Sequence, residues 1–515
     1  MMRYKEGDED YKGAWLSAPA IALGSIYLTA QNVLSTLIGV FGYAFLARMI
    51  TVEQMGAIAG LTLLTSLAQL ISDFGLNSSL AKFVSELRGR GEDPSGHILS
   101  SLSFRIITSL ALALPLFIFS TDISTTLFKA AGYSGVIRLL AIDSALISIA
   151  PLLNAVLWGS GKLKEMAIYG TASSAIRWLA IAAFLIGGYS LNGIVLGWVA
   201  GDAALLLMLS LAISKIIAFK RSLLRMPMEK LPGLLKFSWP IYLASATSFL
   251  YTWYDRALIL AYLPLSQLGI YNIVYTAFGV LTSVSASLGS SLFPYYGMAY
   301  GRNDHKAITL GMKRASKYTM LAVFPLMLGL AVTARPAITL FAGRQYEGGW
   351  PILVILSLFG LVYGLSPAFS NLLLIYGRTK TMLVLNLTSV AISLSLLPLV
   401  WALGLAGLAL MRGASLLLTF ALSLYFISKA VKIEVDREAA LKAMASSVAM
   451  AAIVSLVEGL SYDTLLLPLY VSIGAVTYVA AIRACKAVNN EDAQLIREVA
   501  GERAARLLTK VLGIG

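Results

Sequence analysis

Long apolar runs recur along almost the whole chain and are separated by short polar segments. A run of about 20 apolar residues is the length that an α-helix needs to cross the hydrocarbon core of a bilayer. No stretch of about ten residues alternates between apolar and polar positions in the manner of a transmembrane β-strand. The pattern therefore predicts an all-α polytopic membrane protein with about 14 transmembrane helices.

The predicted spans are similar in length and are joined by short connections. Each boundary lies where an apolar run gives way to charged residues or to glycine and proline. We place the spans at residues 25–47, 55–76, 97–119, 136–158, 165–187, 191–214, 237–261, 267–291, 315–334, 350–374, 381–402, 404–428, 440–458 and 464–484.

The 40 lysine and arginine residues are distributed unevenly over the predicted connections. Most lie in the N-terminal segment, in every second connection after it and in the C-terminal tail. The remaining connections hold only Arg48, Lys129, Arg335 and Arg344. Because cytoplasmic loops of membrane proteins are enriched in basic residues, we expect both termini in the cytoplasm of a multi-pass protein of the cell membrane. The net charge of +14 thus reflects topology, and we expect no nucleic-acid partner.

Several kinds of chemistry lack the residues that they need. The chain has one cysteine, Cys485, and two histidines, His97 and His305, so we expect neither a disulfide framework nor a metal site. No glycine-rich phosphate-binding motif ends in lysine, and no nucleophile is paired with a base. We therefore predict a protein that is not an enzyme and uses no cofactor.

An internal repeat relates the two halves of the chain. Residues Ile50-Thr-Val-Glu-Gln-Met-Gly56 match Leu263-Pro-Leu-Ser-Gln-Leu-Gly269, and Leu76-Asn-Ser-Ser-Leu80 matches Leu288-Gly-Ser-Ser-Leu292. Further on, Asn154 matches Asn371. Six spans fit into one period, so both copies share one orientation. This predicts two six-helix lobes related by a pseudo-two-fold axis along the membrane normal.

The repeat defines the expected domain boundaries. We predict an N-terminal lobe at 1–214, a basic cytoplasmic linker at 215–236 and a C-terminal lobe at 237–430. Two further spans follow at 431–484, and an amphipathic cytoplasmic tail at 485–515. Segments 79–90 and 492–512 carry apolar residues on one helical face, which is typical of helices on the inner membrane surface, although solvated amphipathic helices remain an alternative.

Charged residues inside predicted spans are the first candidates for a functional site, because they usually face a bundle interior or a hydrated cavity. Asp143, Asp255, Arg256 and Arg412 are expected ~8–12 Å below the outer surface, and Arg177 and Asp202 near the membrane centre. Arginine suits an anionic phosphate substrate because its planar guanidinium donates two parallel hydrogen bonds. The alternative is that these aspartates and arginines only pair with each other and hold helices together. Asp73, Arg105 and Arg138 also fall within spans.

Aromatic residues surround the charged pair of the seventh span. Tyr251 and Tyr254 lie within about one and a half turns before Asp255 and Arg256, and deeper than an interfacial aromatic belt. Aromatic faces and hydroxyl groups suit a sugar. We therefore include Tyr251 and Tyr254 among the candidate substrate-binding residues, with the aromatic belt as the alternative.

Four short motifs, taken together, resemble one known family. They are Leu46-Ala-Arg-Met-Ile50 followed by Gly56, Asp73-Phe-Gly-Leu76, Asp255-Arg256 and Gly269-Ile-Tyr-Asn272. Their order resembles polysaccharide and O-antigen flippases of the multidrug/oligosaccharidyl-lipid/polysaccharide superfamily. The resemblance implies 12–14 helices in two lobes and transfer of a lipid-linked oligosaccharide across the membrane. It also implies that Arg48, Asp255 and Arg256 contact the glycan-diphosphate head group.

These observations lead to a functional hypothesis. We expect a flippase that moves a lipid-linked oligosaccharide across the lipid bilayer by alternating access, with H⁺ or Na⁺ as a coupling ion and Arg256 as the most function-sensitive buried charge. One alternative is an ion-coupled multidrug exporter of the same superfamily, which needs an acidic, apolar pocket. A second alternative is a membrane-embedded enzyme that modifies glycans.

Overall fold

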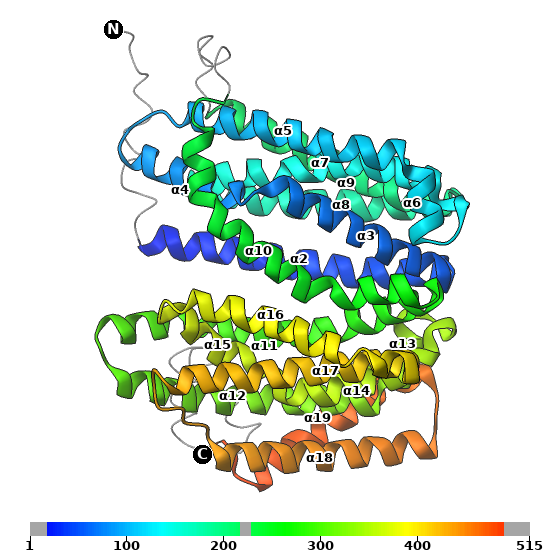
Figure 1. Cartoon of the computed structure of the whole chain (residues 1–515). Coiled ribbons are helices and arrows are strands. Elements are labelled where there is room, and N and C mark those ends of the chain that lie inside the picture. Colours follow the sequence, from blue (N-terminus) through cyan, green and yellow to red (C-terminus); the bar gives the residue numbers. More distant parts are fainter. Residues whose placement is uncertain (1–17, 217–227, 489–515) are drawn as a thin grey trace. The chain divides into compact units, whose positions relative to one another are not determined.

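The protein is described by a computed structural model that covers residues 18–216 and 228–488 (Figure 1). These residues form eighteen α-helices and three short 3₁₀ helices, and the described ranges contain no β-strand. Within these two ranges, twelve helical segments are long and apolar enough to cross a membrane. The all-α polytopic membrane architecture predicted from the hydrophobic pattern is thereby confirmed.

Two of the predicted spans do not belong to these twelve segments. The span expected at 237–261 is α10 (Leu231–Tyr262), whose 32 residues include Lys236, Asp255 and Arg256. The span expected at 381–402 is α16 (Thr379–Ser395), which has 17 residues. Both are helices at the expected places, but the hydropathy of α10 is lowered by its serine, threonine, tyrosine and tryptophan residues, and α16 is short.

The described chain divides into two compact units between Leu268 and Gly269. In the first unit, α8 packs against α2 and α9, α7 packs against α5 and α9, and α10 packs against α3, α4 and α5 (Figure 1). The helices of this unit are α2 (Ala18–Met49), α3 (Val52–Asp73), α4 (Leu76–Gly89), α5 (Ser95–Ile118), α6 (Ser120–Leu127), α7 (Ser134–Gly159), α8 (Leu163–Ile186), α9 (Ser190–Ser214) and α10.

In the second unit, α12 packs against α14 and α18, and α17 packs against α14, α15 and α16. The helices here are α11 (Leu265–Gly301), α12 (His305–Val332), α13 (Ala334–Ala342), α14 (Trp350–Tyr363), α15 (Ser366–Ile375), α16, α17 (Pro398–Ser428), α18 (Arg437–Leu460) and α19 (Leu467–Ala484).

The single span expected at 350–374 is wrong in detail, because the structure divides it into α14 and α15. The division falls at Gly364 and Leu365, directly before α15, whose second residue is Pro367. Proline is well tolerated in the first turn of a helix but not in its interior. A Cβ on Gly364 would lie 2.6 Å from the Val323 side chain, so the bend also depends on a residue without a side chain.

The junction between α3 and α4 is set by two residues with left-handed backbone. Phe74 has φ 47° and Gly75 has φ 72°, a conformation that ends helices and that glycine adopts without steric cost. In the second copy of the repeat, Ala286 and Ser287 stand at the matching positions, and α11 continues through them without a break. The two copies therefore differ where the first has its glycine.

Helix α4 corresponds to the amphipathic segment predicted at 79–90. Its apolar residues Leu76, Leu80 and Val84 are fully buried in a core that α5, α7, α9 and α10 also form. The apolar face that we expected against the membrane surface thus packs against protein. The reason is that α10, distant in sequence, contributes Leu231 and Leu234 to the same core.

The lobe boundaries derived from the repeat, 1–214 and 237–430, stay a prediction. The two compact units are defined by which helices pack together, whereas the lobes are defined by the sequence repeat, so one division does not test the other. The linker at 215–236 lies partly outside the described residues. The amphipathic segment expected at 492–512 lies wholly outside them.

Candidate functional site

The first unit contains a cavity of about 360 Å³ among α2, α3, α7, α8 and α9. Three of the predicted site residues line it, each from a different helix: Asp143 from α7, Arg177 from α8 and Asp202 from α9. Aromatic rings and neutral polar groups form most of the remaining lining, namely Tyr43, Trp178, Trp198, Gln69, Thr62, Thr65, Ser66, Ser173 and Ser174. Four aliphatic residues and a glycine complete it, namely Leu46, Ile58, Ile147, Leu205 and Gly170.

The three charged groups form one cluster. The Arg177 guanidinium donates through Nη2 to Asp202 Oδ1 and forms an ion pair with it. The carboxyl groups of Asp143 and Asp202 are close enough to share a hydrogen bond when one of them carries a proton. Asp143 Oδ1 and Asp202 Oδ2 are buried and have no hydrogen-bond partner among the described residues.

Burial differs sharply within this cluster. Asp143 is 1% exposed and the Asp202 side chain 2%, whereas the Arg177 side chain is 29% exposed. The carboxyl groups therefore lie in the wall of the cavity, and the guanidinium lies where an entering ligand can reach it.

Glycines bring the helices of this site close together. A Cβ on Gly201 of α9 would lie 2.6 Å from Arg177 Cβ, and Ser173 donates to the Gly201 carbonyl at 3.0 Å. A Cβ on Gly42 of α2 would lie 2.2 Å from the Trp178 ring. Small residues allow transmembrane helices to approach closely. The close approach of α8 and α9 is what places Arg177 beside Asp202.

The charged pair of α10 forms a second cluster in the first unit. Arg256 Nη1 lies 3.7 Å from Asp255 Oδ1 and donates to the Thr252 carbonyl at 3.3 Å. The guanidinium also lies over the Trp253 ring, 4.9 Å from its centroid. Asp255 is fully buried and Arg256 is 8% exposed. The two adjacent residues therefore contact each other directly.

The remaining candidates are not among the residues that line the cavity. Tyr254 is 7% exposed and Tyr251 is half-buried, both on α10, and Arg48 is exposed in the last turn of α2. In the second unit, the buried Arg412 donates through Nη2 to the Tyr275 hydroxyl at 3.1 Å. None of these residues, nor Asp255 or Arg256, belongs to the cavity lining among the described residues.

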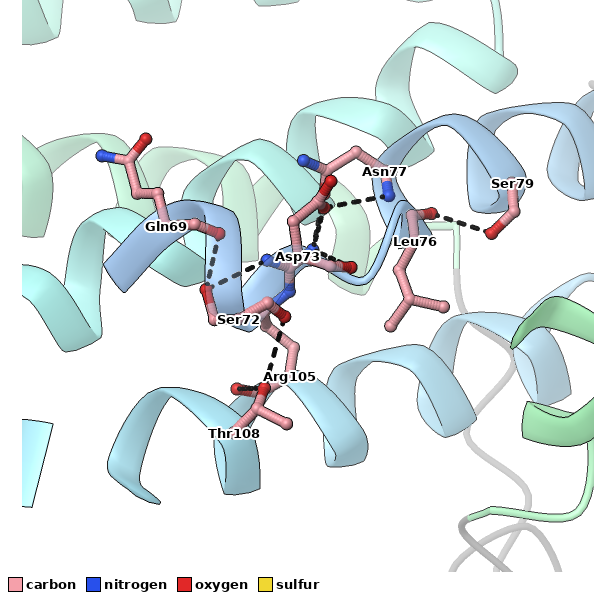
Figure 2. A network of polar contacts seen from close by, with 8 residues as sticks. All are labelled: Gln69, Ser72, Asp73, Leu76, Asn77, Ser79, Arg105 and Thr108. Atoms are coloured by element: carbon pink, nitrogen blue, oxygen red, sulfur yellow. Dashed lines mark hydrogen bonds and ion pairs between the residues drawn. The ribbon is translucent and has the colours of Figure 1, made fainter. Parts of the chain in front are cut away.

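The predicted intramembrane charges Asp73 and Arg105 meet at the junction of α3 and α4 (Figure 2). Arg105, 1% exposed, donates through Nη2 to Asp73 Oδ1 at 2.5 Å and to Asn77 Oδ1 at 2.9 Å. Its Nη1 lies 3.4 Å from Ser72 Oγ. One guanidinium on α5 thus holds the end of α3 and the start of α4, which indicates a structural role.

Comparison with known proteins agrees with the fold and the motifs. The sequence pattern of a family described as "Polysaccharide biosynthesis protein" matches residues 45–351, more than half of the chain. A probable low-salt glycan biosynthesis flippase of Haloferax volcanii is 24% identical over 340 residues, which are 65% of this chain and 68% of that protein. A succinoglycan biosynthesis transport protein of Rhizobium meliloti is 24% identical over 332 residues, 62% of this chain and 63% of that protein.

A solved structure shows the same architecture. A lipid II flippase in an inward closed conformation superposes with a TM-score of 0.71 over 93% of this chain and 100% of that chain. At 17% sequence identity this likeness concerns the fold alone. The family match confirms the resemblance that the four motifs indicated: the chain belongs to the polysaccharide biosynthesis protein family, and its apolar helices make it a multi-pass membrane protein.

Proposed function

We propose that the protein is a flippase that moves a lipid-linked oligosaccharide from the inner to the outer leaflet by alternating access. The observation that carries the proposal is a polar cavity inside an apolar helical unit, with a guanidinium exposed to it. Family membership and two relatives, a probable glycan biosynthesis flippase and a succinoglycan biosynthesis transport protein, support the same function.

The cavity suits a head group better than a whole glycan lipid. Its volume of about 360 Å³ lies at the lower end of small-molecule sites, so it accommodates a phosphate group and an adjoining sugar. Arg177 would bind the phosphate through its planar fork, and Tyr43, Trp178 and Trp198 would offer aromatic faces to the sugar. The polyprenyl chain would stay in the lipid, where its transfer costs no desolvation of polar groups.

The other candidate residues enter the proposal in supporting roles. Arg256, Asp255, Arg48, Tyr251, Tyr254 and, in the second unit, Arg412 would contact the substrate at other stages of transport. We also propose that H⁺ or Na⁺ is a coupling ion of the cycle, that both termini are cytoplasmic and that the protein catalyses no covalent reaction.

The direct test is leaflet accessibility of defined lipid-linked oligosaccharides in proteoliposomes that contain the full chain. We expect transfer to the opposite leaflet with wild-type protein and a loss of at least about tenfold with Arg177→Gln, because one charged hydrogen bond to phosphate contributes roughly 1.5–3 kcal/mol. Arg138→Gln is the matched control, since Arg138 is an exposed arginine of α7 that bonds to Ser120 outside the cavity. Formation of a modified glycan without any change of leaflet would instead indicate an enzyme.

A second candidate function rests on the acidity of the cavity. Asp143 and Asp202 outnumber Arg177, and an acidic site is what an exporter of organic cations needs. Uptake of a fluorescent organic cation into the same proteoliposomes, abolished by Asp143→Asn but unaffected by lipid-linked glycan, would favour this multidrug-exporter function.

A further inference from the structure

The charges in the cavity of the first unit do not balance. With all three groups ionised, Asp143 and Asp202 contribute two negative charges and Arg177 one positive charge. An uncompensated charge in a buried site carries a desolvation cost that protein groups avoid by pairing or by binding a proton. Both carboxyl groups are almost fully buried, and each keeps one oxygen without a partner among the described residues.

A proton fits this site better than a metal ion. The described residues contain no cluster of three or more histidine, cysteine, aspartate or glutamate side chains that could hold a metal. The Arg177 guanidinium already occupies one oxygen of Asp202 and would repel a second cation. Two carboxyl groups within hydrogen-bonding reach of each other readily hold a proton between them, because like charges so close do not both stay ionised.

Arg177 is the only other charged group that faces this carboxyl pair among the described lining residues. Helix α2 contributes the Tyr43 hydroxyl as a further titratable group, and α3 contributes neutral residues such as Gln69 and Thr65. Because the Arg177 side chain is 29% exposed, it can turn from Asp202 toward a ligand in the cavity, whereas the buried carboxyl groups cannot follow it.

We propose that Asp143 and Asp202 form a proton-binding site that is linked through Arg177 to the binding of the substrate's phosphate groups. When a phosphate binds the Arg177 guanidinium, the carboxyl pair loses the positive charge that stabilised its ionised form. The pair then binds a proton, which replaces that positive charge. Linkage is reciprocal, so protonation of the pair in turn releases Arg177 for phosphate. The inference rests on the proposed function in one respect, namely that the substrate head group is a phosphate or diphosphate.

The sequence confines this device to the first unit. Asn154 matches Asn371 in the repeat, which sets Asp143 opposite Gly360. The nearby match of Gly161 with Gly377 sets Arg177 opposite Ser393. At these positions the second copy of the repeat has neither an aspartate nor an arginine, so the proposed coupling is a property of one lobe.

The experiment measures proton uptake during binding of farnesyl diphosphate, a soluble prenyl diphosphate, to the purified full chain. Titration calorimetry in two buffers of different ionisation enthalpy, between pH 6 and 8, gives the number of protons bound per ligand. We expect uptake of up to about one proton per diphosphate beyond what the probe itself binds in solution, and an affinity that falls by up to about tenfold per pH unit as the pH rises. Asp143→Asn and Asp202→Asn should abolish this excess.

Two variants separate the proposed linkage from a general effect on the fold. Arg177→Gln should weaken binding of the probe about tenfold or more and remove the excess proton, whereas Arg138→Gln should change neither quantity. Binding that is unchanged in Arg177→Gln, the absence of binding by wild-type protein, or equal proton uptake by wild-type protein and Asp143→Asn would each overturn the inference.

If an asparagine variant does not accumulate, proton uptake by the wild-type protein is sufficient to test the inference. Binding of farnesyl diphosphate without any excess proton overturns it. Na⁺-dependent binding of the probe at constant pH would also overturn it and assign the pair to a metal ion. Proton-linked binding in a protein that fails to flip lipid-linked glycans would leave this inference intact and refute the proposed function, so the two outcomes are distinguishable.

Discussion

At the scale of single residues, the buried charges of this protein fall into two groups. Arg105 uses its guanidinium to contact three side chains at the junction of α3 and α4 and has 1% exposure. Arg177 makes its ion pair with Asp202 while remaining open to a cavity. A buried charge that contacts several protein side chains stabilises a structure, whereas one that borders a cavity is available to a ligand.

Replacement of Arg105 should therefore affect stability before transport. Arg105→Ala leaves the Asp73 carboxylate without its partner, and breaking a buried pair in this way costs about 3–5 kcal/mol. Arg105→Lys keeps the charge but loses the second nitrogen of the guanidinium, since Nη2 contacts Asp73 and Asn77 while Nη1 contacts Ser72. We expect a lowered thermal midpoint in detergent for both variants and a larger decrease for alanine. A midpoint for Arg105→Ala equal to that of Arg138→Gln would contradict the structural role.

Arg256 offers a case in which stability and transport can be separated. It pairs with Asp255 and stacks over Trp253, so Arg256→Lys should lower transport and Arg256→Ala should nearly abolish it if the guanidinium binds substrate. If it only compensates Asp255, the alanine variant should accumulate poorly instead. Protein level and flipping must be measured together. Normal accumulation with wild-type flipping would exclude a substrate role for Arg256.

At the scale of elements, glycines decide where helices break and how closely they pack. Gly75 combines a left-handed backbone with close contact to α10, since a Cβ there would lie 2.6 Å from the Ser238 carbonyl oxygen. Gly201 and Gly42 have no unusual backbone requirement but allow α8 to approach α9 and α2. The break between α3 and α4 and the position of Arg177 thus both depend on residues without side chains.

Gly75→Ala should destabilise the first unit for two reasons. A left-handed backbone costs a residue with a Cβ roughly 1–2 kcal/mol, and the contact with a backbone carbonyl cannot be relieved by a rotamer change. Gly89→Ala is the matched control, because its Cβ would meet nothing within 4 Å at the end of α4, and it should be neutral or stabilising by up to about 1 kcal/mol. Thermal unfolding of the two variants in detergent measures the difference, and equal midpoints would refute the argument.

At the scale of the whole molecule, the distribution of basic residues predicts the orientation in the membrane. The 40 lysine and arginine residues favour one side of the predicted topology, which places both termini and the segment at 215–236 in the cytoplasm. The region around Gln267, where the second copy of the repeat begins, is then expected on the outer side.

Labelling of cysteines with a membrane-impermeant maleimide tests this orientation. The native Cys485 is exposed and should react only after the membrane is opened. In a Cys485→Ser background, Glu229→Cys should behave in the same way, whereas Pro264→Cys, close to Gln267, should react in intact cells. Reaction of Glu229→Cys from outside would invert the proposed topology.

The sequence by itself determined the fold class, the approximate spans and the family. These properties follow from local patterns, because a bilayer forces every spanning segment to satisfy its own backbone hydrogen bonds within a run of about 20 apolar residues. The four motifs that resembled polysaccharide flippases were likewise continuous in the chain, and the family match confirmed them.

Tertiary structure alone decided which of the buried charges meet. Asp143, Arg177 and Asp202 lie on three different helices, and only the packing of α7, α8 and α9 brings them to one cavity. Gln69, Tyr43 and Trp198 escaped prediction because neutral polar and aromatic residues are ordinary within spans. Asn77 could have been found from its spacing of four residues after Asp73. The rotation of each helix about its axis is set by its neighbours, and no local pattern records it.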